Sequence, residues 1–336
     1  MATVEKQHDA PGIGAFPKVI LIATGGTISG GSASSTDTTD YAIGKVTGID
    51  LIRAIPEIAN VAEVEVIQFT NVASTNLTSD DLLSLAKMAN AYLSDDAVSG
   101  VVITHGTSTT EETGLFLECT VDSAKPVVIV GAMRPGTAIS ADGPLNLLQA
   151  ISLAVSPCAM SRGVLLVSND RIGSALYTSK CHTQAVDAFR SSEAGYLGVF
   201  IGTTPRFFYG PAKVLGMPKF DISATTTLPR VDILYSYQDE DPGYIDCAIT
   251  MGAKGIVMAG TGNSTLSKPM EERVESAMHD GLPVIRASRT GAGFVSARTE
   301  GIASGFYNPQ KARILLMLAI NAGASMDAIV HYFIPA

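Results

Sequence analysis

The sequence predicts an α/β protein built from two doubly wound α/β domains. The larger N-terminal domain has a mainly parallel sheet, and the smaller C-terminal domain is flavodoxin-like. Short apolar, β-branched runs alternate with longer helical stretches, as strands and crossover helices do in such sheets. This alternation occurs twice along 336 residues, and a stretch rich in Pro, Thr and Gly, Gly210–Arg230, separates the two series. A chain of this length is long enough for two domains.

The first series predicts five buried strands with three helices between them. The strands are Lys18–Ala23, Val64–Phe69, Ser99–Ile103, Pro126–Val130 and Gly163–Val167, and the helices are Asp80–Leu93, Thr109–Thr120 and Pro144–Val155. From Gly173 to Phe208 the alternation weakens into short polar pieces. Because the crossovers of such a sheet are right-handed, we expect the reactive loops to gather at the carboxyl ends of the strands.

The second series predicts three strands and three helices. The strands are Val231–Tyr235, Gly255–Ala259 and Pro283–Ala287, and the helices are Tyr244–Gly252, Lys268–Gly281 and Pro309–Ala322. We therefore expect a flexible arm at residues 1–17, a catalytic domain at 18–212, a linker at 213–230 and a second domain at 231–336.

Composition excludes several classes of partner. The 23 Lys and Arg against 32 Asp and Glu give a formal charge of −9, with no basic block that could bind nucleic acid. No apolar run reaches the length that crosses a bilayer, so we expect no membrane contact. Residues 1–18 lack the apolar stretch of a secretory signal, and the four cysteines form no C-x-x-C pair. These features favour the cytoplasm.

The first predicted strand ends in a loop typical of a binding site. Thr24-Gly25-Gly26-Thr27 follows it directly. Adjacent glycines let the backbone approach a ligand closely, and the threonines bring hydroxyl groups to the same edge of the sheet. The alternative interpretation is an ordinary turn whose hydroxyl groups cap the backbone.

The third predicted strand ends in a second loop that carries hydroxyl groups. Thr107 and Ser108 lie there, just before Glu111 and Glu112, and so at the start of a helix and at the same edge of the sheet. For Ser108 taken alone, a simple helix cap is the better explanation. Two threonine-bearing loops on one edge favour a site for a small-molecule substrate.

A hydroxyl nucleophile needs a base, and the histidines offer none. The five histidines are scattered, no G-x-S-x-G motif occurs, and no pair has metal-ligand spacing. A Lys or Tyr side chain therefore remains as the candidate base. Lys180 follows the fifth predicted strand, and a lysine desolvated in a pocket can act as a base, although a single lysine is usually a surface charge. We expect no metal and no organic cofactor.

The chain resembles the bacterial-type L-asparaginases, which include glutaminase-asparaginases. Five motifs match in order over residues 18–313: Ile22–Ile28, Thr104–Thr107 with Glu111–Thr113, Gly131–Pro135, Ser140–Pro144 with Asn146, and Asn308–Arg313. The resemblance implies hydrolysis of an amide through an acyl-enzyme, with Thr27 as nucleophile and Tyr41, on a mobile lid, assisting it.

The resemblance also implies roles for further residues. Thr107 and Lys180 would relay a proton or activate water, and backbone N–H groups near Thr107 and Ala132 would stabilise the oxyanion. The chain would form a homotetramer whose sites are completed across a subunit interface. The substrate-binding set that the resemblance implies is Gly26, Ser74, Thr75, Gly106, Ser108, Ala132, Met133 and Thr265.

The sequence departs from the family pattern in the substrate-binding set. Ser108 replaces an Asp, Thr75 replaces a Gln, and Thr265 replaces an Asn. The stretch between Arg289 and Asn308 is several residues shorter than in the family. In the family, a neighbouring subunit donates an acidic side chain from this stretch, and Glu300 is only a weak counterpart of it. In the family these carboxylates would pair with the α-ammonium group of a substrate. Loss of the Asp also leaves Lys180 without a counter-ion, which should lower the pKa of Lys180.

Three hypotheses follow from these observations. The first is an asparaginase-class hydrolase that cleaves the side-chain amide of L-asparagine, or a related amide. The second uses the same scaffold to hydrolyse an amide, lactone or ester that is not an amino acid. The third is a non-catalytic protein that binds a small anion. A dinucleotide-binding oxidoreductase is excluded, because the first loop lacks G-x-G-x-x-G.

Overall fold

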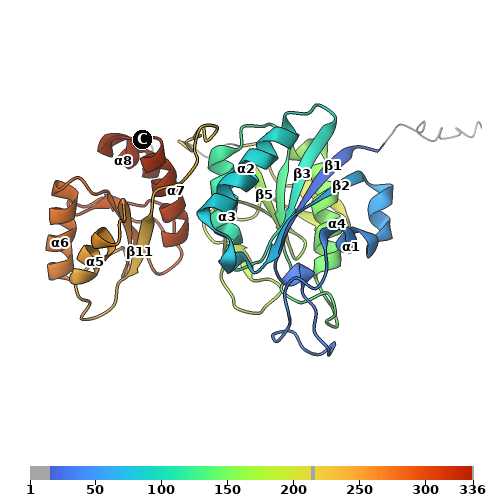
Figure 1. Ribbon diagram of the computed structural model, residues 1–336, viewed down its shortest axis with the longest axis horizontal. Helices are drawn as coiled ribbons and strands as arrows, with labels where there is room; N and C mark the ends of the chain where they lie inside the picture. The colour runs from blue at the N-terminus through green and yellow to red at the C-terminus, as the bar shows by residue number, and fades with distance from the viewer. Residues whose placement is uncertain (1–15, 213–215, 335–336) are drawn as a thin grey trace, which may run out of the picture.

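The computed structural model contains two α/β units that lie side by side (Figure 1). The structure describes residues 16–212 and 216–334. Residues 1–15 of the predicted arm, 213–215 of the predicted linker and 335–336 of the second predicted domain lie outside the described residues. Among the described helices, none is long and apolar enough to span a membrane.

The larger unit is built on an eight-stranded sheet. In spatial order its strands are β10 (Thr204–Phe207), β9 (Gly198–Ile201), β6 (Arg171–Ser174), β5 (Val164–Ser168), β4 (Val127–Val130), β3 (Val98–Thr104), β1 (Lys18–Gly25) and β2 (Glu63–Val72). The five strands β1 to β5 run parallel, and the remaining three pair antiparallel. The sheet is therefore mainly parallel, as predicted.

Alternation of side chains along the strands produces two cores, one on each face of this sheet. Ile20 and Ile22 of β1 face one core, and Val19 and Leu21 face the other. The helices α2 (Ser79–Leu93) and α3 (Thr110–Thr120) cover the first face, and α1 (Gly48–Arg53) and α4 (Gly143–Ala154) cover the second. Short 3-10 helices lie at Thr27–Ser29, Pro56–Asn60, Ser74–Asn76 and Pro157–Ala159.

The smaller unit has a four-stranded parallel sheet. Its strands, in spatial order, are β11 (Val231–Tyr235), β12 (Gly255–Gly260), β13 (Val284–Ser288) and β14 (Ile302–Ala303). Its helices are α5 (Gly243–Thr250), α6 (Lys268–His279), α7 (Pro309–Asn321) and α8 (Met326–Phe333). Ile256 and Met258 of β12 pack with α5 and α6, whereas Val257 shares a core with α7.

Helix α7 joins the two units. It contacts β11, β12 and β13 on one side and α3 of the larger unit on the other, and it lies on the face of its unit that is turned toward α3 (Figure 1). Ile314 and Leu318 of α7 belong to the same hydrophobic cluster as Leu115 of α3. One continuous core therefore extends from the smaller unit into the larger.

The predicted fold class, two α/β units of which the larger has a mainly parallel sheet, is confirmed. The strands of the smaller sheet follow chain order, without the reversal of a flavodoxin-like sheet, and further differences lie between β5 and the linker. The weakly patterned stretch 173–208 contains strands of three or four residues, which are too short to display an alternating pattern. Among them, β7 (Thr178–Lys180) and β8 (Phe189–Ser191) form a separate antiparallel pair. Lys180 thus follows the fifth strand in the chain and ends β7. Helices α1 and α8, of six and eight residues, were also not predicted.

The strand order reverses between β1 and β3. The chain passes from β1 to β2 on one side, and β3 then lies on the other side of β1. In an open α/β sheet, the loops that leave the carboxyl ends of two such strands separate and leave a crevice. The loops that carry Thr27 and Thr107 leave this point of the sheet.

Candidate active site

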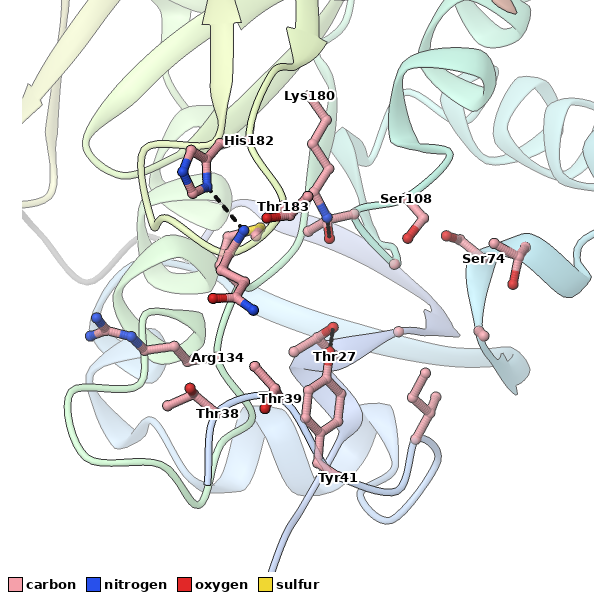
Figure 2. Close-up of a pocket in the computed structure, with 18 of the residues that line it drawn as sticks. Thr27, Thr38, Thr39, Tyr41, Ser74, Ser108, Arg134, Lys180, His182 and Thr183 are labelled. Carbon is pink, nitrogen blue, oxygen red and sulfur yellow. Dashed lines mark hydrogen bonds between the residues drawn. The ribbon is translucent and has the colours of Figure 1, made fainter. Parts of the chain in front are cut away.

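A pocket of about 640 Å³ opens at the carboxyl ends of β1, β2 and β3. This volume is within the usual range for small-molecule sites. Thr27, Tyr41 and Lys180 lie at its centre, between Ser74 and Ser108 on one side and Arg134 on the other (Figure 2).

Close packing of three loops builds the floor of this pocket. Gly26 has φ +83°, and a Cβ there would lie 2.3 Å from the Cα atom of Gly106. At Gly106 a Cβ would lie 2.9 Å from the Cβ atom of Ser74. The Ser74 carbonyl also accepts a hydrogen bond of 3.0 Å from the Thr109 hydroxyl. Glycine is thus required where the loops after β1 and β3 meet.

The first polar pair in the pocket is Thr27 with Tyr41. Their side-chain oxygens lie 2.7 Å apart, in a hydrogen bond that either hydroxyl group can donate. Thr27 begins a short 3-10 helix directly after β1 and is only 7% exposed. A Cβ at Gly30 would lie 2.9 Å from the Tyr41 ring, so the glycine leaves the space that this ring occupies.

The second polar pair is Thr107 with Lys180. The Lys180 Nζ atom donates a hydrogen bond of 2.8 Å to Thr107 Oγ1. Desolvation lowers the pKa of Lys180 from its ordinary value. A larger fraction of this amine is therefore neutral at a given pH, and a neutral amine can accept a proton through the Thr107 hydroxyl.

His105 is close to the site in the chain but has a structural role. It is fully buried, and burial lowers its pKa to about 4. Its Nδ1 atom lies 2.7 Å from the Gly106 carbonyl oxygen, to which only a protonated nitrogen can donate. The Thr113 hydroxyl lies 2.9 Å from Nε2 and donates to that unprotonated nitrogen. A neutral His105 thus holds the backbone beside Thr107.

Asp142 fixes the loop that follows β4. Its carboxylate accepts hydrogen bonds from the backbone N–H groups of Met133, at 2.9 Å, and Arg134, at 2.9 Å. Asn146 on α4 donates to the same carboxylate at 3.2 Å and to the Gly131 carbonyl at 3.1 Å. Met133 and Arg134 are therefore held at the pocket wall by backbone contacts.

A buried polar cluster links α7 to the two elements that carry the second pair. Lys311 on α7 is 2% exposed and donates to the carbonyls of Leu176, at 2.6 Å, and Thr178, at 2.7 Å. Its Nζ atom also lies 3.8 Å from the Glu111 carboxylate on α3. Asn308 donates to Glu111 at 2.7 Å. The cluster thus holds α3, which follows Thr107, against β7, which ends in Lys180.

Most of the predicted site residues line the pocket. These are Gly26, Thr27, Tyr41, Ser74, Thr75, Gly106, Thr107, Ser108, Met133 and Lys180. Two are not among its lining residues: Ala132, which is 1% exposed, and Thr265, which lies in the smaller unit beyond β12. Glu300 is also outside the pocket and accepts a hydrogen bond from the Thr299 hydroxyl.

The pocket also contains residues that were not predicted from the sequence. They are Thr38, Thr39, Ile43, Ala73, Arg134, His182, Thr183, Gln184 and Ala185. Arg134 belongs to one of the quoted motifs, and residues 182–185 almost directly follow Lys180. Proximity to Lys180 in the chain was therefore the signal that could have identified the latter segment.

Two family models together match almost the whole chain. The model described as "Asparaginase, N-terminal" matches residues 18–213. The model described as "Glutaminase/Asparaginase C-terminal domain" matches residues 230–333.

Relatives with named activities match over similar lengths. A probable L-asparaginase 1 of Schizosaccharomyces pombe is 46% identical over 95% of this chain and 89% of its own length. L-asparaginase 2 of Bacillus subtilis is 46% identical over 95% of this chain and 86% of its own. The crystal structure of a probable cytoplasmic L-asparaginase from Campylobacter jejuni has a TM-score of 0.91 and 40% identity, and covers 95% of this chain and 99% of that chain. The chain therefore belongs to the asparaginase family.

Proposed function

We propose that the chain is an amidohydrolase that cleaves the side-chain amide of L-asparagine, or of a closely related compound, through a threonine acyl-enzyme. The observation that carries this proposal is the arrangement of two polar pairs around one pocket. Thr27 bonds to Tyr41 at 2.7 Å, and Thr107 bonds to Lys180 at 2.8 Å. The names of the relatives, L-asparaginases and a glutaminase-asparaginase, support the same reaction.

In the first half of the reaction, Thr27 Oγ1 attacks the amide carbon. The Oγ1–carbon bond forms as the Thr27 proton leaves along its hydrogen bond with Tyr41. The carbon–nitrogen bond then breaks, and the nitrogen departs as ammonia after gaining this proton. The product of this half-reaction is an ester between Thr27 and the acyl group.

In the second half, water hydrolyses the ester. The neutral Lys180 amine accepts a proton through the Thr107 hydroxyl as the water oxygen bonds to the acyl carbon. The Thr27 oxygen regains this proton when its bond to carbon breaks, which leaves the Lys180 amine neutral again. The lowered pKa of Lys180 supports this role, because the amine must be neutral before it can act as a base.

The decisive experiment is to trap the acyl-enzyme on Thr27. Ammonia release from L-asparagine, L-glutamine and succinamate (asparagine without its amino group) is measured first. The protein is then quenched with acid during turnover of the slowest substrate, and peptide mass spectrometry locates any acyl adduct. We expect the adduct on Thr27 and none on Thr27→Ala. An adduct on another residue would refute the nucleophile assignment.

We also propose the assembly and location implied by the family resemblance. Thr265 would serve the pocket of a neighbouring subunit in a homotetramer. It does not line the pocket of its own chain, which is compatible with this role. Light scattering gives the subunit number. Restored activity on mixing Thr27→Ala with a Thr265→Trp variant would support a shared site.

The four free cysteines and the cytoplasmic relative support a location in the cytoplasm.

The domain limits are part of this proposal. We place the catalytic domain at 18–212 and the second domain at 231–336, with the linker at 213–230 between them. The eight-stranded sheet extends from Lys18 to Phe207, and the four-stranded sheet begins at Val231, which supports these limits.

A further inference from the structure

The loop that connects β7 to β8 forms one wall of the pocket. It begins directly after Lys180, and its residues 182–185 all line the cavity. Figure 2 shows His182 and Thr183 on the side of the pocket that carries Lys180, across from Tyr41. The shape of this wall therefore helps to determine which molecule can lie between the two polar pairs.

The base and the tip of this loop are held in different ways. At the base, the Cys181 N–H group donates to the Ala188 carbonyl at 2.7 Å, which extends the pairing of β7 with β8. Ala188 is 0% exposed, so the core holds this end. At the tip, His182, Thr183 and Gln184 are exposed. The shape of the tip therefore depends on hydrogen bonds within the loop.

The His182 ring supplies two of these hydrogen bonds. Its Nδ1 atom accepts the backbone N–H groups of Gln184, at 3.1 Å, and Ala185, at 2.9 Å. Because a backbone N–H group can only donate, Nδ1 carries no proton, and the proton of the neutral ring is on Nε2. An asparagine side chain holds a turn in the same way, with an oxygen atom as the acceptor. The ring is thus the acceptor around which residues 183–185 fold.

A protonated His182 ring cannot form either bond, because both of its nitrogens then donate. Histidine is the side chain whose charge usually changes between pH 5 and 8, so acid removes the acceptor. Other titratable groups surround the ring. Those that line the pocket are Tyr41, Arg134 and Lys180, and those on the loop itself are Cys181 and Asp187, of which Asp187 pairs with Arg190 at 2.8 Å.

We infer that His182 is a positioning residue for substrate binding, because its unprotonated Nδ1 atom holds the pocket wall that the substrate contacts. A proton on the ring releases this wall. The inference rests on the proposed function and adds a residue to the same site. His182 acts through the backbone of residues 183–185, so its effect should appear in binding and much less in kcat.

Two variants separate the acceptor from the rest of the ring. His182→Asn places an oxygen near the position of Nδ1, so it can accept the same N–H groups, and it does not titrate. His182→Ala has no acceptor. Both should fold, because the ring is exposed.

The ligand for these variants is the product of the amide that the wild-type protein hydrolyses best, which is L-aspartate, L-glutamate or succinate. Calorimetry at pH 8 measures its Kd. We expect His182→Ala to raise Kd by about tenfold and His182→Asn by less than about threefold, with kcat changed by less than about threefold in both. An unchanged Kd in His182→Ala would overturn the inference, and so would an equal loss of binding in the two variants.

The pH dependence of the same Kd tests the release of the wall. As pH falls from 8 to 5, we expect the Kd of the wild-type protein to rise toward that of His182→Ala, because the ring loses its acceptor. The Kd of His182→Asn should rise less. The other titratable groups are common to all three proteins, so the difference between the wild type and His182→Asn isolates the ring. Parallel pH profiles for these two proteins would contradict the inference.

Hydrogen exchange measured by mass spectrometry locates the effect without turnover. At one pH, a peptide that covers residues 183–188 should exchange faster in His182→Ala than in the wild type, and His182→Asn should match the wild type. Bound product should slow this exchange in the wild type, because it contacts the wall. Faster exchange with an unchanged Kd would mean that the turn is structural only, and the inference would fail.

Failure of the proposed function would be recognised separately. If no amide releases ammonia and no acyl adduct forms, the proposed function fails. L-Aspartate then serves as the ligand, and the same comparison of Kd values and exchange rates decides whether His182 positions the wall for binding.

Discussion

Lys180 and Thr107 are 73 positions apart in the chain, yet their side chains share a hydrogen bond of 2.8 Å. Lys180 ends the three-residue strand β7, and Thr107 follows β3. The cluster around Lys311 holds the elements that carry both residues. The geometry of this pair therefore depends on the smaller unit as well as the larger.

Removal of the Thr27 hydroxyl should abolish turnover. Thr27→Val keeps the shape of the side chain. We expect it to lower kcat/KM by at least about 1,000-fold for whichever amide the wild-type protein hydrolyses best. Steady-state assays of ammonia release measure this loss. Thr27→Ser is the matched control, because it keeps the hydroxyl group and should remain active.

Tyr41→Phe removes only the partner of the Thr27 hydroxyl. We expect kcat to fall on the order of 100-fold, because the Thr27 proton loses its route while the ring still fills the space beside Gly30. The same assay measures kcat and KM separately. A change in KM alone would show that Tyr41 binds substrate and takes no part in proton transfer.

Lys180 should determine the acid limb of the pH–rate profile. Because its pKa is lowered by desolvation, kcat, which includes hydrolysis of the ester, should rise with pH through a value below the ordinary lysine pKa, as the amine becomes neutral. Lys180→Met should remove this limb and most of the activity. Lys180→Arg keeps the charge but cannot act as a base, so appreciable activity in this variant would disprove the proton-transfer role.

His105 should make the protein less stable in acid. Its pKa is about 4 in the folded state against an ordinary value of 6.5, so the unfolded chain binds a proton between these values and the folded chain does not. Stability is therefore lost as pH falls from 6.5 to about 4, by about 3 kcal/mol. Urea unfolding at several pH values should show this loss in the wild type, and His105→Asn should lack this part of it.

Lys311→Met should destabilise the protein by about 3 to 5 kcal/mol, because it leaves the buried Glu111 carboxylate without its cation. Denaturant unfolding measures the difference. The control is Lys18→Met, which removes a cation from the partly exposed pair with Glu65 and should have little effect. Similar losses in the two variants would contradict a special role for the buried pair.

The parallel strands β1 to β5 and β11 to β13 were predictable from the sequence because they are apolar, β-branched runs. The same runs located Thr27 and Thr107, since each threonine closely follows such a strand at one edge of the sheet. The position of Lys180 was less clearly indicated by the sequence. Its strand is too short to display a pattern, and its approach to Thr107 depends on contacts with α7, which lies more than 120 residues further along the chain.

The positions of Arg134 and His182 could not be predicted for a related reason. Arg134 is placed by backbone contacts to Asp142, and residues 182–185 are placed by a turn around the His182 ring. Neither interaction leaves a periodic pattern in the sequence. Ala132 and Thr265, which were taken from the family resemblance, do not line the pocket of their own chain, so their roles remain predictions.

The shared core around α7 makes the two units mutually dependent. Protease cleavage in the linker should leave two fragments that stay associated, because α7 would still be packed against α3. A chain that ends before α7 should instead expose an apolar wall beside Glu111 and loosen the strand that carries Lys180. The larger unit is therefore a poor candidate for an independent minimal enzyme, although all of the described lining residues of the pocket lie within it.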